Sequence, residues 1–313
     1  MVPRRVLGSS GIEVSALSLG SWMTFEYLPR ETGIAVLSAA RASGIDFFDD
    51  ARYDDQSGAA PMKTGYSEVV FGELFRAVGF ERGETVVANK LWWEFWPGED
   101  AAAELDGSLR RMGFDYLDLV YANPPAEGLG IPELVGSVCE LISSGKARSW
   151  GIVNWPARLI AEAVEVAARA GVPAPCAAQL PYSLAQRSPV EDEEMVAVLR
   201  ASRIPVVASA VLAGGALTGK YASTGTAGRV STRLDDPRLR RALEAGEQLR
   251  ALAARVGAAP AAMAIAYALS NPDVASVLFG ATSAAQVVEN ASAVELQSSM
   301  DDALLRELRQ IGL

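Results

Sequence analysis

The stretch TVVANKLWWEFWPGEDAAAELDGSLRRMGFDYLDLVYAN, residues 85–123, contains one complete strand–helix–strand unit. Apolar runs at residues 85–90 and 116–123 flank a helix-like segment at residues 100–112 that stops at Gly113. Both strands are continuous apolar runs, which is typical of parallel strands covered by helices on both faces. The unit therefore predicts a parallel sheet with helical crossovers.

The same alternation continues along the rest of the chain. Six further strands are expected at residues 14–20, 47–50, 147–154, 176–182, 205–212 and 276–281. Further helices are expected at residues 32–42, 67–78, 132–144, 157–170 and 191–202, within 236–271, and at 283–293 and 301–310. Several of these segments end at a glycine, which is a common helix stop signal.

Eight strand–helix units in 313 residues favour an α/β fold of the (β/α)8 or TIM barrel type, with a doubly wound sheet as the competing architecture. The segment at residues 4–14, with Ser9-Ser10-Gly11 in its middle, predicts an N-terminal β-hairpin before the first barrel strand. The last predicted helices are extra C-terminal helices. No linker or low-complexity segment divides the chain, so we expect a single domain over residues 1–313.

The composition argues against several classes of function. A net charge of −10 and a pI near 4.8 make nucleic acid an unexpected partner. The sequence has no apolar run long enough for a membrane span and no signal-peptide pattern, so we expect a cytoplasmic protein. Cys139 and Cys176 are isolated in apolar surroundings and are interpreted as small buried side chains.

The chain contains no histidine. This excludes a Ser-His-Asp triad, a Cys-His pair and a histidine-bound zinc, and we expect no metal site. Any general acid or base must be Asp, Glu, Tyr, Lys or Cys.

Two nucleotide-binding motifs are only partly matched. The run GGALTGKY at residues 214–221 resembles a phosphate-binding loop, but Tyr221 follows Lys220 where a magnesium-binding Ser or Thr is required. The first predicted strand is followed by Gly20 alone, without the GxGxxG pattern of dinucleotide-binding dehydrogenases.

Polar residues gather where the predicted strands end, which is the active-site face of a TIM barrel. They are Ser21, Asp49, Asp50, Lys90, Asn123, Asn154, Gln179, Tyr182, Ser209 and Thr282. A buried Lys90 needs a counter-ion, and Asp49 is the natural candidate. A tyrosine beside this pair is expected to have its pKa lowered by the ammonium and so become a usable proton donor. The alternative is an ordinary ion pair at the barrel mouth.

Five of the six tryptophans also follow predicted strand ends: Trp22, Trp92, Trp93, Trp96 and Trp155. They either pack the loops or line an aromatic pocket for a large planar or apolar substrate.

These strand ends lie within or beside eight ordered motifs that resemble one known family. The motifs are LGSSGIEVSALSLGSWMTF, GIDFFDDA, SEVVFGELF, VVANKLWW, YLDLVYANPP, GKARSWGIVNW, LAGGALTGKY and SVLFGATSAAQVVEN. Over nearly its whole length the chain resembles the NADP-dependent aldo-keto reductases, and most of all the branch with the β subunits of voltage-gated potassium channels.

The resemblance implies hydride transfer between NADPH and a carbonyl carbon, with a tyrosine as proton donor. It assigns the orienting aspartate to Asp49, the lysine that tunes the tyrosine to Lys90, and the residue that directs the carbonyl to Asn123. Most of the family has histidine at this last position, whereas the channel β subunits have asparagine. The family tyrosine falls on Asp54 here, so Tyr53 is expected to be the acid, with Tyr66 as the alternative.

The resemblance also implies a cofactor site, formed by Gly20, Ser21, Trp22, Asp49, Asn154, Gln179, Ser209, Leu212, Gly214, Lys220, Arg229, Gly280, Thr282, Gln286, Glu289 and Asn290. Ser209 replaces the aromatic side chain that stacks on nicotinamide in relatives. The substrate pocket is expected to include Trp22, Tyr53, Trp92, Trp93, Asn123 and Trp155.

Three functions remain open on the sequence. The first is NADPH-dependent reduction of a bulky ketone of secondary metabolism, as in a polyketide-pathway ketoreductase, and the second is a deoxysugar reductase. The third is an NADP-binding sensor or accessory subunit with slow or no turnover. A small-molecule carbonyl substrate and a homo-oligomer, a tetramer or larger, are implied by the resemblance alone.

Overall fold

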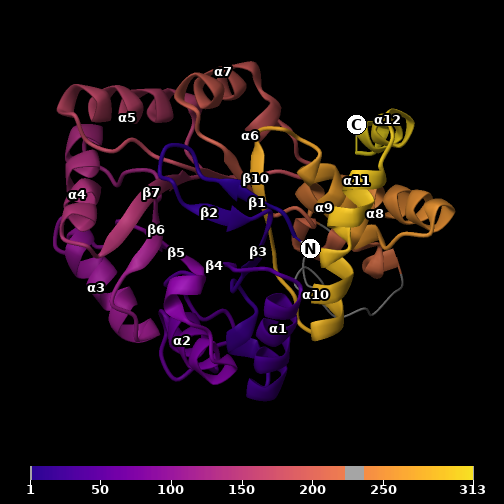
Figure 1. Ribbon diagram of the computed structural model, residues 1–313, viewed down its shortest axis with the longest axis horizontal. Helices are drawn as coiled ribbons and strands as arrows, with labels where there is room; N and C mark the ends of the chain where they lie inside the picture. Colours follow the sequence, from indigo (N-terminus) through magenta and orange to yellow (C-terminus); the bar gives the residue numbers. More distant parts are fainter. Residues whose placement is uncertain (1, 223–235, 313) are drawn as a thin grey trace.

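The computed structural model describes residues 2–222 and 236–312, and within them eight parallel strands close into a barrel surrounded by helices (Figure 1). The strands are β3 (Leu17–Gly20), β4 (Phe47–Asp49), β5 (Val86–Leu91), β6 (Leu117–Ala122), β7 (Ala147–Val153), β8 (Ala178–Pro181), β9 (Val206–Ser209) and β10 (Val274–Phe279). Each strand pairs with the next one in the sequence, and β10 pairs with β3 to close the barrel. The predicted TIM barrel is confirmed.

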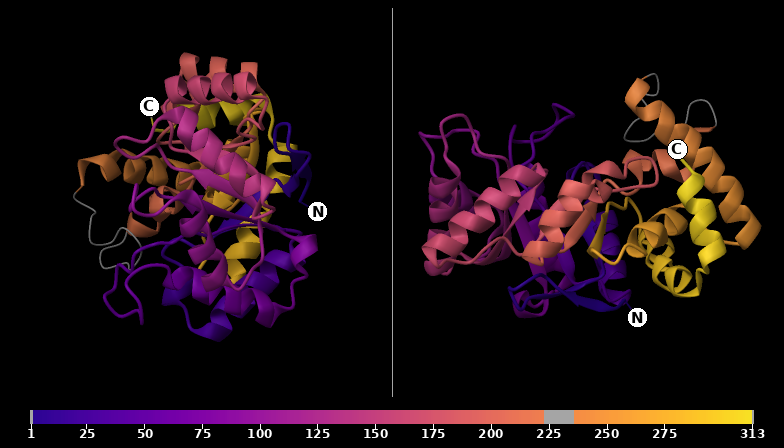
Figure 2. Two further views of the ribbon diagram at one scale, coloured as in Figure 1. Left: turned by 90° about the vertical axis from the view of Figure 1, so that its left-hand side faces the viewer. Right: turned by 90° about the horizontal axis from the view of Figure 1, so that it is seen from above.

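The helices follow the predicted order. They are α1 (Arg30–Ala42), α2 (Tyr66–Val78), α3 (Ala101–Met112), α4 (Ile131–Ser143), α5 (Ala157–Ala170), α6 (Ser188–Glu191), α7 (Glu193–Ser202), α8 (Pro237–Val256), α9 (Pro260–Leu269), α10 (Ala284–Ala291), α11 (Ala293–Ser299) and α12 (Asp302–Gln310), with short 3-10 helices η1 (Phe25–Tyr27), η2 (Arg82–Glu84), η3 (Ala213–Thr218) and η4 (Lys220–Ala222). Helices α8, α9, α11 and α12 gather at one side of the barrel (Figures 1 and 2).

The N-terminal hairpin closes the bottom of the barrel. Strand β1 (Arg4–Val6) pairs antiparallel with β2 (Glu13–Ser15). Leu7, Ile12 and Val14 of this hairpin form one buried cluster with residues of the barrel strands, including Phe47 and Leu119. The expected first strand at residues 14–20 is therefore divided, because its beginning belongs to the hairpin and only Leu17–Gly20 enters the barrel.

Other elements also differ from the sequence expectation. Strand β9 stops at Ser209 rather than at residue 212, because Ala210 has a positive φ of 53° and turns the chain out of the strand. Helix α11 was not predicted as a separate element.

Among the described residues, no single helix is long and apolar enough to cross a membrane. The segments Leu239–Val256 and Pro260–Leu269 pass that test only as a pair, with a bend of 96° between them.

The contact between α2 and α3 depends on a glycine. A Cβ atom added to Gly72 in α2 would lie 2.0 Å from the carbonyl oxygen of Met112 at the end of α3. Gly136 in α4 is exposed, and a Cβ atom there would meet nothing within 4 Å.

We expect opposite effects from alanine at these two helical glycines. Gly72→Ala should lower the free energy of unfolding by about 1–3 kcal/mol or more, because the backbone of α3 must move. Gly136→Ala should raise it by about 0.5–1 kcal/mol through helix propensity alone. Chemical denaturation measures both, and a stabilising effect of Gly72→Ala would contradict the described packing.

Candidate active site

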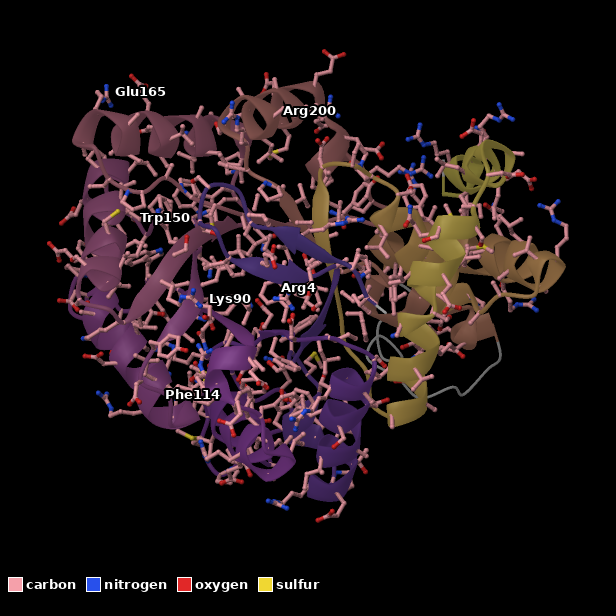
Figure 3. The ribbon with its side chains drawn as sticks, in the orientation of Figure 1. Arg4, Lys90, Phe114, Trp150, Glu165 and Arg200 are labelled. Carbon is pink, nitrogen blue, oxygen red and sulfur yellow. The ribbon has the colours of Figure 1, made fainter. Side chains whose placement is uncertain are left out.

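A buried ion pair lies at the C-terminal end of the barrel strands. The ammonium of Lys90 in β5 lies 2.5 Å from one carboxylate oxygen of Asp49, the last residue of β4. The other oxygen of Asp49 accepts a hydrogen bond from the side chain of Gln179 in β8, at 2.9 Å. Figure 3 shows Lys90 inside the ring of helices, whereas Glu165 lies at the outer edge. The predicted partnership of Lys90 and Asp49 is confirmed.

Tyr53 is the tyrosine that reaches this pair. Lys90 Nζ donates to the phenol oxygen of Tyr53 at 3.1 Å. The Tyr53 N–H donates to the carbonyl oxygen of Ala51, which forms a tight turn, and the Gly65 N–H donates to the carbonyl oxygen of Tyr53. Tyr66 begins α2 instead, and the hydrogen bonds of Lys90 go to Asp49, to Tyr53 and to the backbone of Asp50.

The predicted lowering of the tyrosine pKa is wrong. Burial raises the pKa of Tyr53 above its usual range, and although the Lys90 ammonium lowers it, this effect is smaller, while Asp49 raises it further. Burial works against the charged form of Lys90, but Asp49 and Tyr53 outweigh it and raise the pKa of Lys90. At neutral pH the site therefore holds a protonated phenol beside a charged ammonium.

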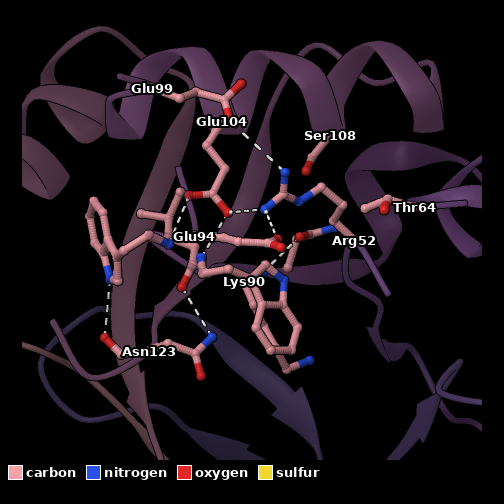
Figure 4. Close-up of polar contacts among 12 residues, drawn as sticks. Arg52, Thr64, Lys90, Glu94, Glu99, Glu104, Ser108 and Asn123 are labelled. Atoms are coloured by element: carbon pink, nitrogen blue, oxygen red, sulfur yellow. Dashed lines mark hydrogen bonds and ion pairs between the residues drawn. The ribbon is translucent and has the colours of Figure 1, made fainter. Parts of the chain in front are cut away.

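Asn123 follows β6 directly and is fixed against the end of β5. Its backbone N–H and its side-chain Nδ2 both donate to the carbonyl oxygen of Leu91, each at 3.0 Å, and the indole N–H of Trp93 donates to its carbonyl oxygen (Figure 4). The side-chain hydrogen bond of Asn123 therefore goes to the backbone of β5. Since Nδ2 carries two hydrogens, one N–H remains after this bond.

The aromatic residues divide into two groups. Trp22, whose surface is 49% exposed, and Trp92 flank Tyr53, with ring centroids 6.5 Å and 6.0 Å away. Trp93 and Trp155 were expected in the substrate pocket, but both are buried in the hydrophobic core. The aromatic surface beside Tyr53 therefore comes from Trp22 and Trp92.

The residues predicted for cofactor binding lie on neighbouring strands. Strands β7, β8, β9, β10 and β3 adjoin one another in the closed barrel, so their ends form one continuous arc of the mouth. Gly20 ends β3, Ser21 and Trp22 follow it, Asn154 follows β7, and Gln179 belongs to β8. Ser209, Leu212, Gly214 and Lys220 belong to β9 or to the segment after it, and Gly280, Thr282, Gln286, Glu289 and Asn290 follow β10. Arg229 lies outside the described residues.

These residues differ in accessibility. Asn154, Lys220, Thr282, Gln286 and Glu289 are exposed, as a ligand-binding surface requires. Gln179 and Asn290 are buried, and Gln179 is bonded to Asp49. Within the described structure Gln179 therefore contacts the ion pair rather than the open mouth.

Two features of this arc suit a ligand with phosphate groups. The exposed Lys220 crosses the turn at Gly215, where a Cβ atom would lie only 2.9 Å from the Lys220 side chain. On the next strand, helix α10 begins at its capping residue Ser283 beside the exposed Thr282, and helix N-termini attract anions. An ammonium and a helix N-terminus on adjacent strands fit NADP(H).

The chain is a TIM barrel with a buried Asp49–Lys90 pair at the strand ends, and a comparison with known families shows which family it belongs to. The aldo/keto reductase family pattern matches residues 16–310, and the chain belongs to this family. Its members typically are NADP-dependent oxidoreductases, whose general reaction is carbonyl reduction with NAD(P)H.

Three relatives carry names of channel subunits. A probable voltage-gated potassium channel subunit beta of Oryza sativa subsp. japonica is 33% identical over 309 residues, which cover 93% of this chain and 90% of the relative. A putative subunit beta of Schizosaccharomyces pombe is 31% identical, with 99% and 93% covered. A probable subunit beta of Arabidopsis thaliana is 30% identical, with 97% and 95% covered.

Sequence reasoning assigned no role to Asp50, which is fully buried beside this site. One of its carboxyl oxygens accepts hydrogen bonds from the hydroxyl of Ser21 and the N–H of Ala51. The other oxygen has no hydrogen-bond partner among the residues that the structure describes. Burial, and then the nearby carboxylate of Glu68, raise the pKa of Asp50 to about 8.

Asp50→Asn should therefore change the pH dependence of stability. Between pH 5 and pH 8 the unfolded chain has already lost the Asp50 proton, because an ordinary aspartate has a pKa of about 4, whereas the folded protein keeps it. The wild-type free energy of unfolding therefore falls as pH rises through this range. The variant loses that effect, and its stability relative to wild type should grow by up to about 1.4 kcal/mol per pH unit. Denaturant unfolding at both pH values measures the difference, and a constant difference would contradict a protonated Asp50.

Proposed function

We propose that the protein is an NADPH-dependent carbonyl reductase in which Tyr53 is the general acid. The observation that carries this proposal is the hydrogen-bonded series Asp49–Lys90–Tyr53 at the barrel mouth. The phenol oxygen already accepts an N–H from Lys90, so its own O–H is the donor that remains for a substrate oxygen. Bound NADPH would supply the hydride to the carbonyl carbon.

Each residue of the series has a distinct task in this proposal. Tyr53 gives its proton to the alkoxide oxygen, which is a stronger base than a phenolate. Lys90, 3.1 Å from the phenol oxygen, stabilises the phenolate charge that remains. Asp49 keeps the ammonium charged and in place, and Gln179 fixes Asp49. The remaining N–H of Asn123 is proposed to donate to the substrate carbonyl.

The raised pKa of Tyr53 is compatible with this task. A proton donor must be protonated before the reaction, and burial keeps the phenol neutral at physiological pH. The Lys90 ammonium then favours the charged product of the transfer over the starting phenol.

The substrate is proposed to be a bulky ketone of secondary metabolism, as for a polyketide-pathway ketoreductase. Trp22 and Trp92, whose rings both lie close to Tyr53, support an apolar substrate with a large surface. Exposed apolar side chains on the neighbouring mouth loops, Tyr27, Met62 and Phe95, support the same class. A deoxysugar, with many hydroxyl groups, would find fewer partners on this aromatic surface.

A second candidate function is an NADP-binding sensor or accessory subunit with slow turnover. The names of the three relatives suggest it, and the bond of the Asn123 side chain to the Leu91 carbonyl oxygen favours slow chemistry. A homo-oligomer is proposed from the family likeness alone.

A turnover assay separates the two functions. Purified protein is mixed with NADPH and a panel of small aldehydes and bulky aromatic ketones, and cofactor oxidation is followed by absorbance. The reductase proposal expects turnover, fastest with the bulky ketones. Tight NADPH binding without oxidation on any substrate would reject it in favour of the sensor.

Tyr53→Phe and Tyr66→Phe test the identity of the acid. The first variant should lose about 100- to 10,000-fold in kcat, because its ring keeps the packing but has no proton to give. Tyr66→Phe should stay close to wild type and serves as the matched control. Steady-state kinetics with NADPH in excess decides, and a reversal of the two results would make Tyr66 the acid.

Ser209→Tyr tests the proposed position of the nicotinamide. Ser209 ends β9 and is half-buried, and a ring at this position is expected to stack on the nicotinamide. NADPH affinity should rise by about 2- to 10-fold, measured by fluorescence titration. Ser209→Thr, which adds no ring, should leave the affinity near wild type, and equal affinity for all three proteins would place the nicotinamide elsewhere.

A further inference from the structure

Arg52 occupies the apex of the turn that carries Tyr53. The hydrogen bond from the Tyr53 N–H to the Ala51 carbonyl oxygen, at 2.8 Å, makes Arg52 the central residue of a three-residue turn. The position of the Tyr53 ring therefore depends on how the backbone at Arg52 is held. Only 8% of the Arg52 side chain is exposed, although it carries a full charge.

Three carboxylates surround the Arg52 guanidinium (Figure 4). Its nitrogens lie 3.0 Å from Glu94, 3.6 Å from Glu104 and 3.9 Å from Glu99. Phe95 lies under the guanidinium, with the ring centroid 4.9 Å away. None of these partners lies on the Tyr53 loop, because all four belong to the loop after β5 or to α3.

Of the three ion pairs of Arg52, the one with Glu104 is the least exposed to solvent. The Glu104 side chain is only 4% exposed, whereas Glu94 and Glu99 are substantially exposed and their attraction is screened by water. The Glu104 carboxylate also accepts the backbone N–H groups of Trp92 and Trp93, at 2.7 Å and 3.2 Å. Arg52 and the backbone beside Trp92 therefore share one buried anchor.

This shared anchor fixes two sides of the site at once. Tyr53 follows Arg52, and the Trp92 ring meets the Tyr53 ring edge-on at 6.0 Å. A guanidinium presents several donors in one plane and can bridge carboxylates on different elements, whereas an ammonium is a point charge on a flexible stem. Loss of Arg52 would remove the link between the turn and α3, and would leave the turn held by its backbone bonds and by the side chains of Asp50, Ser67 and Lys90.

We propose that Arg52 is a positioning residue that holds the Tyr53 phenol against Lys90 through its contact with Glu104. The consequence for kinetics depends on the proposed function, because it needs Tyr53 to be the acid. The positional claim itself does not depend on turnover. Arg52 acts through Tyr53 and has no part of its own in proton transfer.

A double-mutant cycle tests the kinetic consequence. Arg52→Gln should lower kcat by about 10- to 100-fold in the wild-type background, since misplacement of the acid by an ångström has effects of this size. In the Tyr53→Phe background the same change should lower kcat by less than about 2-fold, because the proton donor is already absent. NADPH affinity should be unchanged. Equal losses in both backgrounds, or no loss in either, would overturn the proposal.

Arg52→Lys provides the milder variant if Arg52→Gln does not fold. It keeps the charge but cannot bridge the carboxylates in the same way, so we expect a smaller loss of kcat that again disappears in the Tyr53→Phe background. Arg169→Gln is the matched control, because Arg169 forms an exposed ion pair with Glu165 on α5. It should leave kcat unchanged.

An NMR experiment tests the positional claim without any turnover. In protein labelled with carbon-13 at the tyrosine Cζ atoms, the Tyr53 resonance is assigned from its loss in Tyr53→Phe. Arg52→Gln should move this resonance toward its position in Lys90→Met, which removes the same hydrogen bond to the phenol. Arg169→Gln should not move it. An unmoved Tyr53 resonance in Arg52→Gln would overturn the positional claim even if the protein is an active reductase, and a moved resonance supports it even if no substrate is reduced.

Discussion

The site depends on one buried ion pair, Lys90 with Asp49. An ammonium inside a barrel is costly unless a carboxylate and further hydrogen bonds compensate, and removal of one partner typically costs about 3–5 kcal/mol. Here the compensation is complete on both sides, because Gln179 bonds to the second oxygen of Asp49 and Tyr53 bonds to Lys90. The closed barrel makes this possible, since it brings Gln179 to within 2.9 Å of a residue 130 positions earlier in the chain.

In this account the barrel places the residues for proton transfer and most of the residues for cofactor binding on different strands. The ion pair, Tyr53 and Asn123 come from β4, β5 and β6 and the segments that follow them. Apart from Asp49 on β4, the described residues expected to hold NADPH come from the remaining arc, β7 to β10 and β3. Successive side chains along a strand point to opposite faces. Asp49, two residues after the core residue Phe47, therefore lies on the same inner face, whereas the Asp50 side chain points to the other face. The bonds of Asp50 accordingly go to Ser21 and Ala51.

The regular alternation of apolar strand-like runs with helix-like segments made the barrel predictable from the sequence, and the charge of Lys90 made its ion pair predictable. The apolar runs identified all eight strands, and the need of a buried lysine for a counter-ion identified Asp49. The family resemblance favoured Tyr53 over Tyr66 but left both open, because the contact of Tyr53 with Lys90 depends on the tight turn at Arg52. The direction of the Tyr53 pKa shift depends on how deeply the loops bury the ring. For Trp93 and Trp155, apolar character alone could not tell a pocket wall from the core. Arg52 went unassigned because its partners begin 42 residues later.

The central claim is that the Asp49–Lys90–Tyr53 series supports hydride transfer to a carbonyl. The most direct measurement uses NADPH that carries deuterium at the transferable position of the nicotinamide, a bulky ketone, and mass spectrometry of the alcohol. The account predicts one deuterium at the carbinol carbon with the wild-type protein. It also predicts almost none with Lys90→Met, although that variant still binds NADPH. Tight NADPH binding by the wild-type protein without deuterium in any product, or equal transfer by Lys90→Met, would contradict it.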